Sequence, residues 1–316
     1  MRKIIDDKRL IYQCCSLYYE NNMGQNQIAD YLGISKSSVS RMLQTGREIG
    51  IVEIKVHHVT QYMYRDLEKE LMDKFQLRDA VVAESSPLDS KVDRFTKLGE
   101  RAADYLGRFF RDGEYVGVSV GSMLYSVATA QNDCMQRDCT FVPVLGGLGT
   151  EGTQSSHVAE AFARKYGGKS IPLYVPALFS NEQLMTEFLK EDSVRYIFDY
   201  YEKLNTVVSG INGTLQNQTI ERLGLVSHDQ LEAYMARGAV GNFLLRFLDE
   251  NGNSDKFEEF NRRVAGISME KYRAVNNKIL IAGGTGYSGL IQASIKGDYA
   301  NVLIVDVDCA KELLSK

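Results

Sequence analysis

The residues best suited to chemistry near the start of the chain are serines and basic side chains at the beginning of one predicted helix. Ser35 is suited to cap that helix, and the apolar positions Val39, Met42 and Leu43 recur at helical spacing. This spacing turns the short polar side chains toward solvent, where they could enter a major groove about 12 Å wide and reach base edges and phosphates. We expect DNA contacts from Gln25, Ser35, Lys36, Ser37, Ser38, Ser40, Arg41 and Arg47.

A second set of candidates follows four apolar runs in the rest of the chain. Each run ends in glycine or a small polar residue just before a predicted helix, at 121–123, 146–150, 210–214 and 283–287. Glycine lets the backbone approach a ligand closely, and free N–H groups at a helix start favour phosphate or carboxylate. Because ligands bind outside the carboxyl ends of strands in open α/β sheets, the four loops together predict a ligand site.

Sequence motifs for catalysis and metal binding are missing. The chain has no Gly-x-Ser-x-Gly elbow, Walker loop or His-Glu-x-x-His, and its five Cys and four His show no zinc-site spacing. Asp306 and Asp308 follow the last apolar run, where a carboxylate more often binds a sugar hydroxyl or caps a helix than acts as an acid or base. We therefore expect binding rather than turnover, with no cofactor and no metal.

Three short helices are needed to position the DNA contacts. The pattern predicts an amphipathic helix over 10–19, a second over 25–32 ended by Gly33, and a third that opens at Ser35. This order is typical of a helix-turn-helix, and a helical hairpin that merely packs is the alternative. Residues 51–56 alternate as a strand and could form a wing.

The rest of the chain predicts an α/β fold with a largely parallel sheet. Six apolar runs alternate with helices, at 80–83, 115–120, 140–145, 206–209, 278–282 and 301–306. An amphipathic helix over 62–76 precedes them and could pair with a second copy or pack on its own body. We favour a packing linker that aids dimerisation. The expected organisation is a DNA-binding domain at 1–57, a linker helix at 58–77 and an effector-binding domain at 78–316.

Composition fits an ordinary globular protein of about two domains. The chain has 316 residues, 44% of them hydrophobic and 25% charged, with only four prolines. No apolar run approaches the roughly 18 residues of a membrane span, and an odd number of cysteines suits reduced thiols, so we expect a cytoplasmic protein. The net charge is −4, but residues 1–56 hold eight Lys/Arg against six Asp/Glu, which places a weak excess of positive charge on the predicted DNA-binding module.

The chain resembles a known family in the order of its motifs. Residues 25–35, 39–41 and 46–52 resemble the DNA-binding module of the SorC family of bacterial sugar-responsive transcriptional regulators. The remaining motifs occur in the family's order at 146–149, 238–242, 248–252, 266–268, 282–284 and 302–306. As a set these motifs are specific, although each alone is not.

The resemblance implies a non-enzymatic effector domain with the fold shared by ribose-5-phosphate isomerase and glucosamine-6-phosphate deaminase. It also implies homo-dimers or tetramers on double-stranded operator DNA, whose affinity changes when a sugar, polyol or sugar phosphate binds. The function expected is control of a carbohydrate or polyol utilisation operon. Carried over by motif, the effector pocket would include Gly121, Ser122, Met123, Gly146, Gly147, Leu148, Gly210, Asn242, Gly284, Tyr287 and Asp306.

Two positions depart from the family's pattern and leave the effector class open. Tyr287 stands where family members often carry a lysine, and Asn242 where they often carry an aspartate. The effector is then either an unphosphorylated sugar or polyol, or a phosphate held by backbone N–H groups, and we favour the phosphosugar. The rival interpretations are an isomerase or deaminase using Asp306 or Glu270, and an architectural DNA-binding protein.

Overall fold

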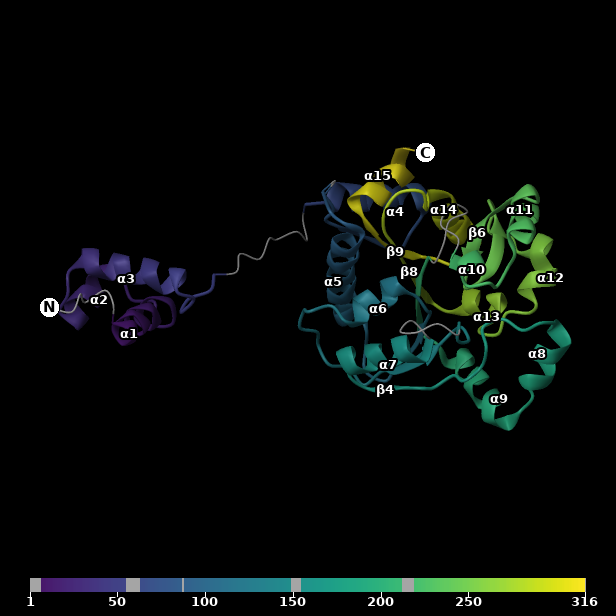
Figure 1. Ribbon diagram of the computed structural model, residues 1–316, viewed down its shortest axis with the longest axis horizontal. Coiled ribbons are helices and arrows are strands. Elements are labelled where there is room, and N and C mark those ends of the chain that lie inside the picture. The colour runs from purple at the N-terminus through teal and green to yellow at the C-terminus, as the bar shows by residue number, and fades with distance from the viewer. Residues whose placement is uncertain (1–6, 55–62, 87, 149–154, 212–218, 316) are drawn as a thin grey trace. The chain divides into compact units, whose positions relative to one another are not determined.

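The computed structural model describes residues 7–54, 63–86, 88–148, 155–211 and 219–315, without the side chains of Ser155, Ser193 and Thr219. The chain divides into two compact units, Met1–Val59 and Thr60–Lys316. Figure 1 draws both units, and each is considered by itself below.

The first unit is a bundle of three helices, α1 (Lys8–Tyr19), α2 (Gln25–Leu32) and α3 (Lys36–Glu48). Its small core is formed by Ile11, Cys14, Cys15, Ile28, Ala29, Val39, Met42 and Leu43. Gly46 allows α1 and α3 to approach closely, because a Cβ at this position would collide with Cys15 Sγ. The predicted helices are confirmed.

The predicted wing strand is wrong over the part that the structure describes. Residues 51–54 form bends and irregular backbone, and residues 55–56 lie outside the described residues. The N–H groups of Ile51 and Val52 both donate to the carbonyl of Gly46, at 2.8 and 3.1 Å. The two apolar side chains also pack against the helical core. The chain therefore folds back onto the end of α3, and its apolar residues Ile51 and Val52 pack there instead of forming a strand.

The connector helix α4 (Arg65–Phe75) packs on its own α/β body. Its Leu71 is fully buried, and Glu68 Oε1 accepts the N–H of Val82 at 3.0 Å. Lys74 Nζ donates to two carbonyls near the end of the chain, each at 3.1 Å. The helix therefore packs on its own body, and its part in dimerisation stays a prediction.

The body is built on one sheet of seven strands, all of them parallel. The six predicted runs are strands, and the two-residue β4 was not predicted. In spatial order the strands are β1 (Asp79–Ala83), β9 (Val302–Asp306), β8 (Asn277–Ala282), β5 (Thr206–Gly210), β2 (Tyr115–Val118), β3 (Thr140–Pro143) and β4 (Lys169–Ser170).

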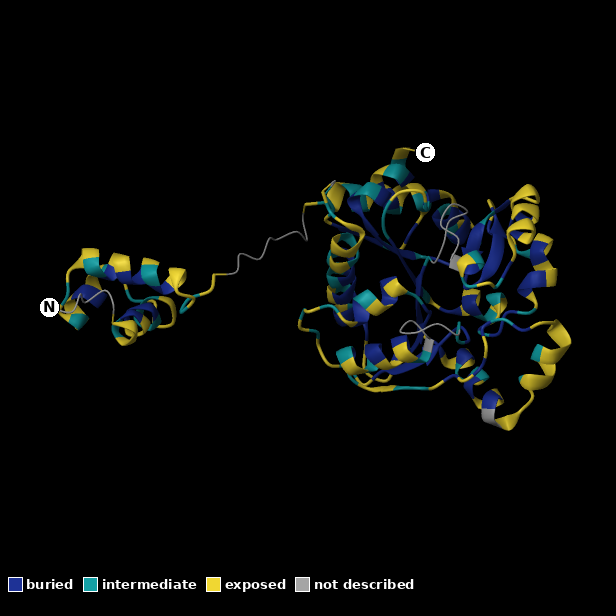
Figure 2. Ribbon diagram, viewed as in Figure 1, coloured by how far each residue is buried: buried dark blue, intermediate teal, exposed yellow. Residues whose placement is uncertain are grey.

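Helices cover both faces of this sheet, so its strands are buried on both sides (Figure 2). Successive strand residues alternate between two cores. In β9, Leu303 and Val305 belong to one core, whereas Val302 and Ile304 belong to the other. One face is covered by α4 and α15 (Val307–Ser315), the other by α5 (Lys91–Phe109), α6 (Ser122–Ala128) and α7 (Ser155–Tyr166).

A two-stranded hairpin lies beside the main sheet and was not predicted. Strands β6 (Ala239–Phe243) and β7 (Arg246–Asp249) are antiparallel, and Leu244 and Leu245 between them both have positive φ, at 48° and 63°. The other helices of the body are α8 (Glu182–Phe188), α9 (Asp192–Phe198), α10 (Thr219–Arg222), α11 (His228–Ala236), α12 (Glu258–Asn261), α13 (Met269–Ala274) and α14 (Ser288–Lys296), with short 3-10 turns at Tyr201–Lys203 and Asp255–Phe257. Among the described residues no helix has the length and apolar character to cross a membrane.

The two glycines that follow β3 differ in the space around them, which allows a matched test. A Cβ on Gly146 would lie 2.5 Å from the Pro176 carbonyl oxygen, whereas on Gly147 the nearest atom would be the Val175 oxygen at 3.7 Å. We expect Gly146→Ala to lower the free energy of unfolding by about 1–3 kcal/mol, because backbone must move. Gly147→Ala should leave it nearly unchanged. Urea denaturation of both variants tests this, and equal effects would contradict it.

Candidate functional site

The turn between α2 and α3 sets the direction of the candidate DNA-binding helix. Gly33 ends α2 in the left-handed region, with φ of 65°, and its N–H donates to the carbonyl of Ala29. Ser35 then caps α3, since its Oγ accepts the N–H of Ser38 at 3.2 Å. The predicted helix, glycine turn and capped second helix are present.

One side of α3 is buried and the opposite side is open to solvent. Val39, Met42 and Leu43 lie in the helical core, as their spacing predicts. Of the residues predicted to contact DNA, Gln25 and Ser38 are half-buried, and the exposed ones are Ser35, Lys36, Ser37, Ser40, Arg41 and Arg47. Short hydroxyl side chains and two cations therefore lie at the exposed start of α3, the part of a recognition helix that reads bases.

Gln44 shares this exposed face and was missed in the sequence. It lies four residues after Ser40, one helical turn further along α3, and it is exposed. Its Nε2 donates to Glu48 Oε1 at 2.9 Å. The four-residue spacing from Ser40 could have identified Gln44 in the sequence. Its amide is a candidate for base recognition, because an amide can make paired hydrogen bonds to adenine.

The order of strands in the body reverses between β2 and β5. From β2 the chain continues to β3 and β4 on one side, and from β5 to β8 and β9 on the other. Ligands of open α/β sheets bind outside the carboxyl ends of strands at such a point. The half-buried Gly121, exposed Ser122 and buried Met123 follow β2 here. Gly210 ends β5, and a Cβ on it would lie 3.9 Å from Met123 Cβ.

The backbone N–H groups of Gly146 and Gly147 already have acceptors. Gly146 donates to the carbonyl of Ala265 at 3.0 Å, and Gly147 donates to the carbonyl of Val175 at 2.8 Å. Leu148 is half-buried against a third core cluster formed around the hairpin. In this structure the predicted loop after β3 therefore joins neighbouring segments of backbone instead of presenting two free donors.

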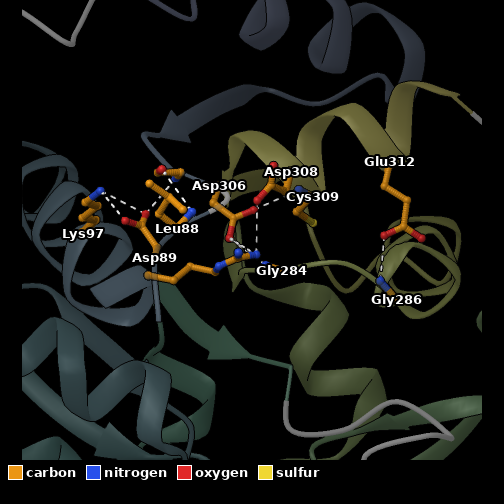
Figure 3. A network of polar contacts seen from close by, with 11 residues as sticks. Leu88, Asp89, Lys97, Gly284, Gly286, Asp306, Asp308, Cys309 and Glu312 are labelled. Atoms are coloured by element: carbon orange, nitrogen blue, oxygen red, sulfur yellow. Dashed lines mark hydrogen bonds and ion pairs between the residues drawn. The ribbon is translucent and has the colours of Figure 1, made fainter. Parts of the chain in front are cut away.

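Asp306 is a fully buried carboxylate at the end of β9 that links two segments (Figure 3). Its Oδ2 accepts the N–H of Gly284 at 2.7 Å, and its Oδ1 accepts the N–H of Cys309 at 2.9 Å. The side chain thus holds the loop after β8 and caps α15. Burial raises the pKa of the Asp306 carboxyl group, although the two N–H groups and Arg94 oppose the rise.

Arg94 places a cation beside this carboxylate and was not predicted. Its Nη1 lies 3.3 Å from Asp308 Oδ2 and 3.9 Å from Asp306 Oδ2. The same atom would be 3.6 Å from a Cβ on Gly284. Arg94 belongs to the first turn of α5, the helix that follows β1. This position could have identified Arg94 in the sequence, because a helix that follows a parallel strand begins near the strand's carboxyl end, where ligands bind.

Further polar contacts fix the loops around Asp306 (Figure 3). Lys97 Nζ contacts both oxygens of Asp89 at 2.9 Å, in the segment between β1 and α5. On the other side, Glu312 accepts the N–H of Gly286 at 2.7 Å and the hydroxyl of Ser288 at 2.8 Å. Carboxylates therefore hold both the segment before α5 and the glycine loop after β8.

Asn242 and Tyr287 come from outside the seven-stranded sheet. Asn242 lies on β6 opposite Phe247 and is 7% exposed. Tyr287 immediately precedes α14, and its ring is half-buried against one of the two main cores. Strand β6 contacts α14, so the two residues belong to adjoining elements. In the described part of the chain, neither side chain makes a hydrogen bond.

Some of the predicted effector residues come together in the structure. Met123 meets Gly210, and Gly284 meets Asp306. All four lie at the carboxyl edge of the sheet, meaning the edge where its parallel strands end. The remaining parts of two predicted loops, 149–150 and 212–214, lie outside the described residues.

The two carboxylates considered for proton transfer lie at opposite edges of the sheet. Asp306 is at the carboxyl end of β9, whereas Glu270 lies in α13, which leads into the amino end of β8. A general acid and a general base must both reach the same substrate. This pair therefore forms no acid–base site.

Two protein-family models match the chain. Residues 61–315 match the model of a sugar-binding domain, which covers most of the chain. Residues 19–53 match the IclR helix-turn-helix domain and include α2 and α3.

Transcriptional regulators resemble the chain over almost its whole length. The sorbitol operon regulator of Klebsiella pneumoniae is 30% identical over 317 residues, with 98% of each chain covered. The deoxyribonucleoside regulator of Bacillus subtilis (strain 168) is 28% identical, again with 98% of each covered. The crystal structure of full-length SorC from K. pneumoniae matches with a TM-score of 0.84 at 28% identity, covering 98% of this chain and 99% of that one. These relatives are regulators, not enzymes.

The two aspartates beside Arg94 should contribute unequally to stability. Asp306→Ala leaves the half-buried N–H of Gly284 and the buried N–H of Cys309 without acceptors, so we expect a loss of about 2–4 kcal/mol in the free energy of unfolding. The side chain of Asp308 is 31% exposed and pairs with Arg94, so Asp308→Ala should cost less than about 1 kcal/mol. Chemical denaturation measures both, and equal losses would contradict the role given to Asp306.

Arg41 provides a test of the exposed α3 face. If Arg41 contacts a phosphate, Arg41→Ala should weaken binding to the DNA upstream of the protein's own gene. It should also reduce the slope of log K against log salt by about 0.9. The control is Arg222→Ala, which removes an exposed arginine from the other unit. Fluorescence anisotropy at several salt concentrations gives both quantities, and an unchanged affinity and slope would exclude the contact.

Proposed function

The chain belongs to the SorC family of sugar-binding transcriptional regulators, and from this membership we propose that it controls an operon for the use of a carbohydrate or polyol. Its target is double-stranded operator DNA, and its effector is a sugar, polyol or sugar phosphate. Such a regulator acts in the cytoplasm, where the DNA is. The relatives named for sorbitol and deoxyribonucleoside regulation support this class of effector.

The observation that carries the proposal is the presence of two matched parts in one chain. A helix-turn-helix with an exposed Ser, Lys and Arg face precedes a parallel α/β body whose match to a sugar-binding domain spans residues 61–315. An architectural DNA-binding protein needs no such second part. The finer likeness of the body to ribose-5-phosphate isomerase and glucosamine-6-phosphate deaminase is part of the same proposal.

The effector site that we propose lies at the carboxyl edge, around Ser122, Gly210 and Gly284. Ser122 offers an exposed hydroxyl, and Tyr287 and Asn242 offer hydrogen-bonding groups from adjoining elements. Arg94 adds a positive charge close to Gly284. This guanidinium is paired with Asp308 at 3.3 Å, and we favour the sugar phosphate because a phosphate could replace Asp308 in that contact, whereas Tyr287 carries no charge.

The control of DNA binding that we propose involves at least two copies of the chain. Operators of helix-turn-helix proteins have two half-sites, and their spacing mirrors the symmetry of the protein. We propose a dimer or tetramer in which the bound effector changes the spacing of the DNA-binding units. A coupling free energy of about 1–3 kcal/mol is enough for regulation.

A thermal-shift screen of the full chain against sugars, polyols and their phosphates tests this function. A ligand at about a hundred times its Kd adds ~2.7 kcal/mol of stability, which gives a clear rise in Tm. The hit is then tested for its effect on binding to DNA upstream of the gene. We expect a ligand that both raises Tm and changes the affinity for DNA.

Two serine variants separate the two halves of the proposal. Ser122→Ala should reduce the Tm shift caused by the ligand and leave DNA binding without ligand unchanged. Ser40→Ala should weaken DNA binding and leave the Tm shift caused by the ligand unchanged, because Ser40 lies on α3 in the other unit. A hit that is chemically consumed, with DNA binding unaffected, would favour an enzyme and contradict the regulator.

A further inference from the structure

A polar cavity that is open to solvent lies on the body, at the opposite end of β1 from the carboxyl edge. It has a volume of about 480 Å³ and lies between the first residues of β1 and the second half of α5. Its lining contains Asp79, two aromatic residues and four arginines: Tyr105, Phe109, Arg78, Arg101, Arg108 and Arg111. The cavity shares no residue with the proposed effector site.

The arginines of this cavity are poorly neutralised. Among the residues that the structure describes, Arg78, Arg108 and Arg111 have no carboxylate within ion-pair distance. Arg101 lies 3.5 Å from Glu68, but its Nε is buried and makes no hydrogen bond. Like charges held together repel one another, and a buried N–H without an acceptor has a free-energy cost.

The single acid in the lining does not balance these charges. Asp79 Oδ2 accepts the hydroxyl of Tyr105 at 2.8 Å, and its Oδ1 accepts the N–H of Ala80 at 2.9 Å. Both carboxylate oxygens are thus engaged within the fold. The four guanidinium groups are opposed by the carboxylates of Asp79, of Glu68 beside Arg101 and of Glu114 near Arg111, and the cavity keeps a small excess of positive charge.

Helix stabilisation accounts for only part of this arrangement. Arg108 and Arg111 lie at the carboxyl end of α5, where cations favour the helix dipole, and Arg111 Nη1 donates to the Arg108 carbonyl at 3.2 Å. Arg101 lies two turns earlier, and Arg78 precedes β1 and bonds to Asn277. The dipole does not explain why these two also line the cavity.

We propose that this cavity binds a small organic diphosphate, such as a nucleoside diphosphate. Guanidinium groups match phosphate oxygens in pairs, and the volume falls within the range of about 300–1,000 Å³ seen for small-molecule sites. Tyr105 and Phe109 stack on each other, with ring centroids 5.5 Å apart at an angle of 26°. They form an aromatic surface beside the arginines that suits a base.

The shape favours a small molecule over DNA. A DNA backbone presents phosphates at regular intervals and calls for a row of cations along a surface. Here the arginines line one short open depression that also contains apolar ring surface. Binding of duplex DNA is therefore an outcome that the test must distinguish.

Calorimetric titration of the full chain with inorganic pyrophosphate, without metal ions, tests the site. Arg108 and Arg111 are exposed, so Arg108→Gln and Arg111→Gln should fold normally, which thermal unfolding checks. We expect each to weaken pyrophosphate binding about tenfold, the effect of losing one charge-assisted hydrogen bond. The control Arg195→Gln, an exposed arginine on α9, should bind normally. Unchanged binding by both cavity variants would overturn the proposal.

Further titrations separate this cavity from other phosphate-binding sites. Saturating pyrophosphate should leave the binding of the effector found in the thermal-shift screen unchanged, because the effector site is elsewhere, and competition between the two ligands would overturn the assignment. ADP should bind more tightly than pyrophosphate, and Phe109→Ala should remove that gain. Equal affinities would overturn the nucleotide part of the proposal. Binding of duplex DNA through these arginines, with no binding of pyrophosphate, would overturn it entirely.

Discussion

The parallel direction of all seven strands is the constraint on which the body depends. Each strand must return by a crossover, so helices cover both faces of the sheet, and the few polar side chains within the strands, such as Ser209 and Lys278, are buried. Chemistry is therefore confined to the strand ends. Because the strands share one direction, the segments after β2, β5, β8 and β9 all begin at the same edge.

The negative charge of Asp306 at that edge is stabilised by a few contacts. Asp306 is buried at the end of β9, which lies between β1 and β8, and this is a costly place for a carboxylate. Two backbone N–H groups and the nearby Arg94 offset that cost. Through these two hydrogen bonds, the Asp306 side chain connects the loop after β8 to the start of α15. The glycine loop thus has a defined shape before any ligand arrives.

Local sequence patterns were sufficient where one element decides the structure. The capped start of α3 at Ser35 and the apolar strands follow from spacing alone. The hairpin could not be found, because Leu244 and Leu245 occupy a left-handed turn that sequence rules reserve for Asn-Gly or Asp-Gly. Burial of both leucines overrides that preference. Contacts across elements were equally hidden, since Gly146 meets Ala265 over a long stretch of sequence.

The last helix, α15, is anchored at both of its ends. Asp306 accepts the N–H of Cys309 in its first turn, and Lys74 donates to the carbonyls of Leu313 and Leu314 in its last. Its nine residues span about 13 Å at 1.5 Å per residue. The helix acts as a strut from the carboxyl edge to α4, the first helix of the body after the DNA-binding unit. Asp306 and α4 are therefore connected through this one helix as well as through the sheet.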